Sequence, residues 1–166
     1  MTTTAPETLW PEKLREVLET LAWLGTPQEQ YAYLIELADA FRPVPPDIAT
    51  PPYPKEHLVP HCESQAYVWA MEEPDKHAFR YYFAVENPQG LSAKALAKIL
   101  DDACSGAPAW QVAQIPEDLP LRIFGERLTM GRTMGLTGMV AMVREPARRH
   151  VAACPVCQQA LRERGA

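Results

Sequence analysis

The sequence predicts an α+β domain, and three patterns in its 166 residues lead to this class. Apolar residues recur every three or four positions before residue 42 and again after residue 90, as in helices that pack on a core. Between these regions, residues 66–85 carry strand-forming side chains on both sides of a polar turn, which indicates an antiparallel hairpin. Helices around a small antiparallel sheet define the α+β class.

The first two elements are predicted to be helices. Pro11 is a favourable first-turn residue and Gly25 ends the first helix, whose apolar face comprises Leu14, Val17, Leu18, Leu21 and Leu24. The second helix opens with Thr26-Pro27-Gln28-Glu29, a capping-box pattern with proline at the first helical position. Its apolar face comprises Leu34, Ile35, Ala38 and Phe41.

A connector rich in proline separates these helices from the hairpin. Six of the seventeen prolines fall within residues 43–54, where they remove amide donors and fix φ. This segment is therefore predicted to be extended but not a central strand. In the hairpin that follows, Phe79, Tyr81, Phe83 and Val85 are expected to share one face.

The remaining chain is predicted to be mostly helical. Residues 91–104 form an apolar helix that ends near Gly106, and a stretch punctuated by prolines follows through Pro120. A last long helix starts at Thr129, a suitable cap; its glycines indicate close packing or a bend, and its methionines are expected in the core. No repeat or second domain is apparent, so we expect one domain over residues 1–146 and a C-terminal extension over residues 147–166.

Composition excludes several classes of function. The net charge of -5 argues against nucleic acid as the main ligand, since such binding needs clustered Lys and Arg. The segment MTTTAPETLW lacks the order of a secretory signal, and no apolar run approaches the roughly 20 residues of a membrane span. We therefore expect a cytoplasmic protein with no membrane partner, whose four cysteines are reduced.

The cysteines are predicted to differ in role. Cys62 follows Val59-Pro60-His61, where the proline disfavours a helix, so the thiol should lie on a loop that enters the hairpin. A half-buried small apolar side chain is the plain alternative there. Cys104 falls on the apolar face of its helix and is expected in the core.

The pair Cys154 and Cys157, in the stretch CPVC, has the spacing of half a zinc site and of a redox pair. Only His150 is a nearby third ligand, and His77 is expected in solvent in a charged turn, so no metal is assigned. An idle tail is the third interpretation of the pair. A corner formed by His57, His61 and Cys62 also lacks a fourth ligand.

Three ordered patches resemble one protein family. VPHCESQAYVW resembles the V-P-G-C-x-S-Q-V-W signature of the SufE family of sulfur acceptors, which take persulfide sulfur from cysteine desulfurases for iron-sulfur cluster assembly. YLIELADAFRPVPP resembles an earlier patch of that family, with matches at Tyr31, Leu34, Ile35, Glu36, Leu37 and Pro46. LTMGRTMGLTGMVAMV resembles its late motif, with matches at Leu128, Thr129, Arg132, Gly135, Leu136 and Met139.

This resemblance implies a concrete assignment. Cys62 falls on the persulfide-carrying cysteine, and Arg132 falls on the arginine of the late motif. Because cations are not favoured at a helix start, we expect Arg132 to pair with a carboxylate here or on a partner. A surface arginine without a specific role is the plain alternative. The implied partners are a SufS-like cysteine desulfurase and a downstream cluster scaffold, with no bound cofactor. The implied fold is the one shared with U-type cluster scaffolds, with a three-stranded antiparallel sheet. His61 departs from the family, because a glycine usually precedes the cysteine, and the loop is therefore expected to differ in shape.

Other functions stay open at this point. A U-type cluster scaffold would need several cysteines in one place, whereas only Cys62 lies in the loop region. A zinc-binding relative without sulfur transfer would use the CPVC pair. A thiol hydrolase would need a histidine that activates Cys62 against a carbonyl. For a sulfur carrier, the aromatic residues of the hairpin are expected to cover the persulfide.

Overall fold

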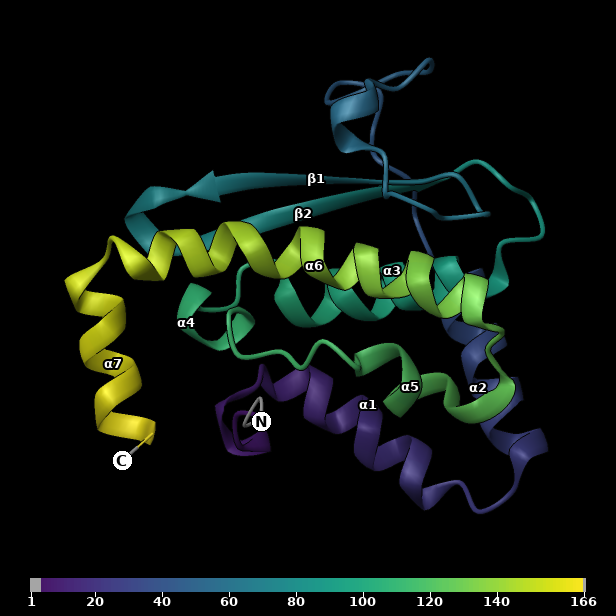
Figure 1. Ribbon diagram of the computed structural model, residues 1–166, viewed down its shortest axis with the longest axis horizontal. Helices are drawn as coiled ribbons and strands as arrows, with labels where there is room; N and C mark the ends of the chain where they lie inside the picture. Colours follow the sequence, from purple (N-terminus) through teal and green to yellow (C-terminus); the bar gives the residue numbers. More distant parts are fainter. Residues whose placement is uncertain (1–3, 166) are drawn as a thin grey trace.

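The computed structural model describes residues 4–165 and shows helices packed against one long hairpin (Figure 1). The helices are α1 (Glu12–Trp23), α2 (Pro27–Asp39), α3 (Leu91–Cys104), α4 (Ala109–Val112), α5 (Leu119–Phe124), α6 (Met130–Ala152) and α7 (Pro155–Gly165). Short 3-10 turns are η1 (Glu7–Leu9), η2 (Lys55–His57), η3 (Pro74–Lys76) and η4 (Gly125–Arg127). The architecture confirms the predicted α+β class.

The predicted hairpin is present. Strands β1 (Ala66–Glu73) and β2 (Ala78–Val85) pair antiparallel, from Ala66 opposite Val85 at one end to Glu73 opposite Ala78 at the other. Between them, η3 leads into His77, whose left-handed backbone (φ 49°, ψ 47°) reverses the chain. The hairpin therefore has two distinct ends, the open end at Ala66 and the turn at His77.

The expected three-stranded sheet is wrong, because the sheet in the described residues has two strands. The proline-rich connector runs beside β2 without forming a ladder of hydrogen bonds with it in the described residues. The Val44 amide donates to the Phe83 carbonyl, 2.7 Å away. Prolines cannot donate to a ladder, so this segment has too few amides to continue as a strand. Within residues 4–165, the outer edge of β1 forms one isolated bridge, between Leu58 and Tyr67.

Both faces of the hairpin are covered. Phe79, Tyr81 and Phe83 are buried in the main core against α3 and α6, as the strand pattern predicted. On the opposite face Trp69 and Ala84 form a smaller buried cluster with Val44 of the connector. The Tyr81 hydroxyl donates to the Val143 carbonyl of α6 at 2.9 Å, and this buried bond fixes the helix on the sheet.

The helices follow the predicted start signals. The Thr26 hydroxyl accepts the Glu29 amide at 3.2 Å, and the Thr129 hydroxyl accepts the Arg132 amide at 3.3 Å. Each bond satisfies one of the amides that a helix start leaves without a partner. Cys104 is fully buried at the end of α3, as expected, and burial raises the pKa of its thiol.

The C-terminal segment packs on the rest of the molecule. Helix α6 lies along the hairpin and continues past Pro146, and after a break α7 turns back beside α4 (Figure 1). Val151, Cys154 and Cys157 are buried members of the main core. Among the described residues, no helix combines the length and the apolar character needed to cross a membrane.

Candidate functional site

The predicted thiol lies on the loop that joins η2 to the open end of the hairpin. Hydrogen bonds hold both ends of this loop, since the Val59 amide donates to the Ala66 carbonyl at 2.8 Å and the Asn87 amide donates to the Ser64 carbonyl at 3.2 Å. Val59 is buried, whereas Cys62 between these anchors is half-buried. The loop therefore presents the thiol at a fixed place close to the surface.

His61 takes the backbone geometry that a glycine would supply. Its φ is +57°, in the left-handed region that glycine adopts without steric cost and that histidine tolerates better than most residues. The left-handed turn before Cys62 thus exists here without the glycine. The exposed His61 side chain lines a groove with Pro60, Met130 and Met134, not the cavity that Cys62 lines.

Helix α6 touches the Cys62 loop through three of its glycines. A Cβ atom built on Gly135 would lie 2.8 Å from the Cys62 Cα and 3.3 Å from its Sγ. One built on Gly138 would lie 3.1 Å from Val59, and one on Gly131 would lie 3.0 Å from the Glu63 carboxylate. These glycines allow the helix backbone to approach the loop, which confirms the close packing predicted from the sequence.

Cys62 and Arg132 line the same cavity, which has a volume of about 310 Å³. Apolar walls come from α2, α5 and α6 and include Tyr31, Leu34, Phe124 and Leu136. The aromatic residues of the hairpin do not line it, so the expectation that they cover the thiol is wrong. Two residues predicted from separate motifs, seventy positions apart in the chain, therefore meet at one cavity.

A second arginine at this cavity was not predicted. Arg127 lies in η4, and its guanidinium donates to the Gln30 side chain of α2 at 3.0 Å. Arg132 is exposed, and among residues 4–165 its guanidinium forms no ion pair. Arg127 directly precedes the late motif at Leu128, and that adjacency was the available signal. The cavity thus combines one thiol with two guanidinium groups and the Glu63 carboxylate.

The histidines near the loop point elsewhere. The His57 ring lies 2.9 Å from the Val68 carbonyl through Nδ1 and stacks on Trp69 with ring centroids 5.0 Å apart. Within the described part of the chain, no histidine lines the Cys62 cavity. The corner of His57, His61 and Cys62 considered as a metal site is therefore not formed.

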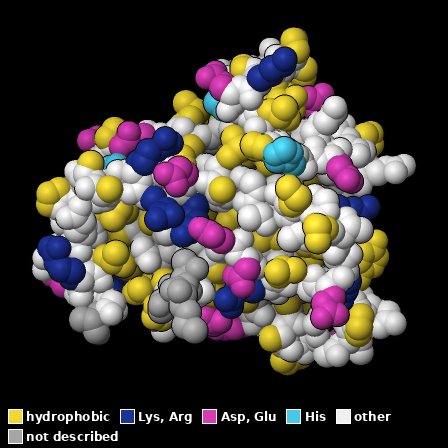
Figure 2. Space-filling view, in the orientation of Figure 1, with side chains coloured by type: hydrophobic (Ala, Val, Ile, Leu, Met, Phe, Trp, Pro, Cys, Tyr) yellow, Lys and Arg dark blue, Asp and Glu magenta, His cyan; other side chains and the backbone are white. Residues whose placement is uncertain are grey.

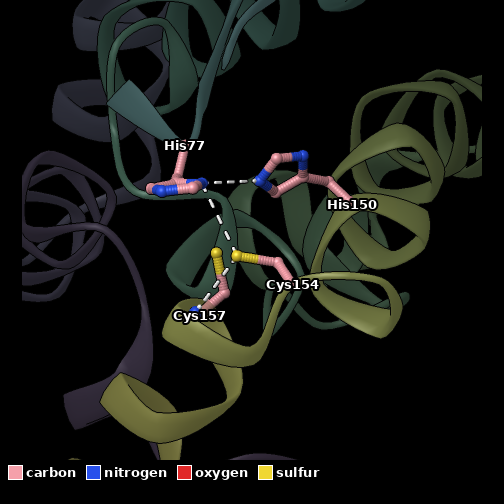
Figure 3. Close-up of side chains that lie close together, drawn as sticks. All are labelled: His77, His150, Cys154 and Cys157. Carbon is pink, nitrogen blue, oxygen red and sulfur yellow. Dashed lines mark hydrogen bonds between the residues drawn. The ribbon is translucent and has the colours of Figure 1, made fainter. Parts of the chain in front are cut away.

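The CPVC cysteines lie at the other end of the hairpin. Cys154 and Cys157 are buried beside His150 of α6 and His77 of the hairpin turn (Figure 3). The expectation that His77 lies in solvent is wrong: it is half-buried, because the turn folds against the junction of α6 and α7. An eight-residue strand is about 26 Å long, so this group is remote from Cys62.

The surface around the Cys62 loop is partly apolar. Met130 is 83% exposed and Met134 is 53% exposed, beside the groove that His61 lines. For these two methionines the expected place in the core is therefore wrong. Figure 2 shows hydrophobic side chains reaching the surface over this side of α6, with acidic and basic groups interspersed across the same face.

The arrangement is suited to sulfur chemistry more than to acyl transfer. A half-buried thiol that lines a cavity is accessible to a sulfur donor, and a cysteine thiolate is the species that attacks sulfur. A hydrolase would also need a base within hydrogen-bond reach of the thiol. Histidine does not supply that base here, since none lines the cavity in the described chain.

Comparisons with known proteins agree with this geometry. The family model "SufE: Fe-S metabolism associated domain" matches residues 15–147 of the chain. A solution structure of a hypothetical protein from Thermus thermophilus superimposes with a TM-score of 0.65 at 24% sequence identity. It covers 86% of this chain and 98% of its own, and it supports the fold. The matched residues include the Cys62 loop, the cavity and most of α6, and the chain therefore belongs to the SufE family of domains associated with iron-sulfur metabolism.

Proposed function

We propose that this protein is a sulfur acceptor, in which Cys62 takes the terminal sulfur of a persulfide from a cysteine desulfurase and passes it on for iron-sulfur cluster assembly. The observation that carries the proposal is the position of Cys62, half-buried at a cavity that it shares with Arg132. Membership of a family associated with iron-sulfur metabolism supports the choice of cargo.

The transfer step is an exchange between sulfur atoms. The Cys62 thiol first gives up its proton, and the thiolate attacks the terminal sulfur of the donor persulfide. A new sulfur-sulfur bond forms on Cys62 while the bond between the donor cysteine and that sulfur breaks, and the donor cysteine leaves as a thiolate that takes up a proton. The exchange needs no external oxidant or reductant, and a second exchange of the same kind delivers the sulfur to a cluster scaffold.

The cavity offers hydrogen-bond donors for the cargo. Arg127 and Arg132 line it together with Cys62, and their guanidinium groups are proposed to donate hydrogen bonds to the transferred sulfur. The volume of about 310 Å³ leaves room for an added sulfur atom among the apolar walls. Those walls limit access of solutes that would reduce or oxidise the persulfide.

The desulfurase is proposed to dock over the rim of this cavity. Met130 and Met134 expose apolar side chains beside the Cys62 loop, and exposed apolar patches with a polar rim are typical of protein contact surfaces. His61 stands in the same groove and is proposed to contact the partner. Arg132, with no ion pair among the described residues, is available to pair with a carboxylate of that partner.

The distribution of cysteines argues against a cluster scaffold at this site. A cluster bound at the cavity would need several thiolates there. Cys104 is buried in the core, while Cys154 and Cys157 lie at the far end of the hairpin, so only Cys62 lines the cavity in residues 4–165. A zinc-binding role, by contrast, does not compete with sulfur transfer, because the two sets of residues are separate.

Mass spectrometry of the Cys62 peptide tests the proposal. The protein is mixed with a cysteine desulfurase and free cysteine, digested without reductant, and we expect the Cys62 peptide to gain the mass of one sulfur atom. Cys62→Ser should lose both this gain and any stimulation of the desulfurase, whereas Cys104→Ala should keep both. No gain on Cys62, under conditions that load a known acceptor, would refute the proposal.

A further inference from the structure

A cluster of four ligands lies at the turn of the hairpin, away from Cys62. His77 comes from the turn and His150 from the last part of α6. Cys154 directly precedes α7, and Cys157 lies in the first turn of α7. One ligand atom from each lies within 4.8 Å of the other three (Figure 3). Two nitrogen and two sulfur donors therefore converge from three separate elements.

Two of the six distances between the ligand atoms fit the edges of a tetrahedron around zinc. With bonds of about 2.0–2.1 Å to nitrogen and about 2.3 Å to sulfur, a tetrahedral site has edges of about 3.3 Å between nitrogens and about 3.6 Å between nitrogen and sulfur. In the structure, His77 Nδ1 lies 3.2 Å from His150 Nε2 and 3.5 Å from Cys154 Sγ. The other pairs lie within 4.8 Å, so the cluster needs only a small contraction to surround one ion.

The contacts of the ligand atoms also favour a cation. His150 Nδ1 lies 2.9 Å from the Glu72 carboxylate, so the other ring nitrogen, Nε2, is the atom that faces the cluster. The Cys154 sulfur accepts the Cys157 amide at 3.2 Å, as a metal-bound thiolate would. His77 Nδ1 can carry only one proton, yet it faces both His150 Nε2 and Cys154 Sγ. A single cation would bind these nitrogen and sulfur atoms together.

The donor set and its burial select the metal. Cys154 and Cys157 are 6% and 2% exposed, and both histidines are half-buried. Two thiolates and two imidazoles in tetrahedral array are typical of structural zinc, whereas calcium and magnesium prefer oxygen ligands. The four protein ligands leave no open position for a substrate, so the ion would be structural.

We propose that His77, His150, Cys154 and Cys157 bind one structural zinc ion, which joins the hairpin turn to the α6–α7 junction. Binding releases the two thiol protons to solvent and changes no oxidation state. Glu72 acts as a positioning residue through His150. Three of the four ligands lie beyond residue 147, outside the match to the family model.

Metal analysis of the reduced full-length protein tests the proposal. We expect one zinc per chain by mass spectrometry of the metal, and a tetrahedral cobalt spectrum with thiolate charge-transfer bands after exchange with cobalt. Cys157→Ser should lose the zinc and the bands. Cys62→Ser and His61→Gln are matched controls that should keep both, because neither residue belongs to the cluster.

A second variant keeps the test independent of folding. Glu72→Gln retains all four ligands and should weaken zinc binding by about 10–100-fold in competition with a chromophoric chelator. Reduced wild-type protein that takes up neither zinc nor cobalt would overturn the proposal. A disulfide between Cys154 and Cys157 with no metal uptake after reduction would overturn it too and would favour the redox pair. Because Cys62→Ser should still bind zinc, neither result depends on the proposed sulfur transfer.

Discussion

Gly135 offers the sharpest test of how the structure positions Cys62. In Gly135→Ala the new Cβ would lie 2.8 Å from the Cys62 Cα, where carbon contacts are normally about 3.5–4.0 Å, so the shortfall is about 0.7–1.2 Å. The obstructing atom belongs to the backbone, and a side-chain rotation cannot relieve the contact. Either α6 or the Cys62 loop must move.

The expected loss of stability follows from two opposing contributions. Overpacking of this kind costs about 1–3 kcal/mol, and replacing glycine with alanine inside a helix recovers about 0.8–1.0 kcal/mol. The free energy of unfolding should therefore fall by about 0–2 kcal/mol. At about 2–4 °C per kcal/mol for a chain of this size, the melting temperature should fall by up to about 8 °C.

Gly131→Ala is the matched control on the same helix. Its new Cβ would meet only the Glu63 carboxylate at 3.0 Å, the flexible end of a side chain that can move away. Denaturation in urea, together with the alkylation rate of Cys62 by peptide mapping, should separate the two variants. A Gly135→Ala protein that is more stable than wild type by the full helix gain, with unchanged Cys62 alkylation, would refute the packing argument.

Three further outcomes are expected. Burial raises the pKa of Cys104 above its ordinary value of 9.0, so the contribution of this thiol to stability should fall as pH rises above 9, by up to about 1.4 kcal/mol per unit. Cys104→Ala should therefore show a shallower fall of stability with pH in urea denaturation. Thr129→Ala should lower the free energy of unfolding by about 1 kcal/mol through loss of its cap, and Thr129→Asp should restore it; equal stabilities would contradict the capping role. Arg132→Ala should slow persulfide transfer to Cys62 about tenfold or more, since a hydrogen bond to a charged group contributes about 1.5–3 kcal/mol, while Arg122→Ala, outside the cavity, should not; equal rates would exclude that role.

Features set by local sequence were predictable. The helix starts at Thr26 and Thr129 depend on residues within one turn, and the hairpin depends on side chains on both sides of a short turn. Cys104 was placed in the core from the apolar face of its own helix. Two separate motifs marked Cys62 and Arg132, but their shared cavity follows from the packing of α6 against the Cys62 loop and was not predicted.

Features set by distant packing were not predictable. The cavity walls at Tyr31 and Phe124 come from helices whose relative placement no local pattern fixes. His77 looked exposed because its neighbours in sequence are charged, but its partners Cys154 and Cys157 lie more than seventy positions away. The prediction of a third strand was wrong for a different reason. It came from the fold implied by the family resemblance, whereas the prolines of the connector over residues 43–54 leave too few amides for a strand.

The family match stops at residue 147, inside α6, five residues before that helix ends. A stop codon or protease cut at this border would leave the Cys62 region intact in sequence but strip Val151, Cys154 and Cys157 from the interior. Phe79, whose ring meets His150 edge-on at 5.9 Å between centroids, would then face water. The match to the family model therefore ends before the folded unit does. A fragment trimmed to residue 147 would expose part of the main core.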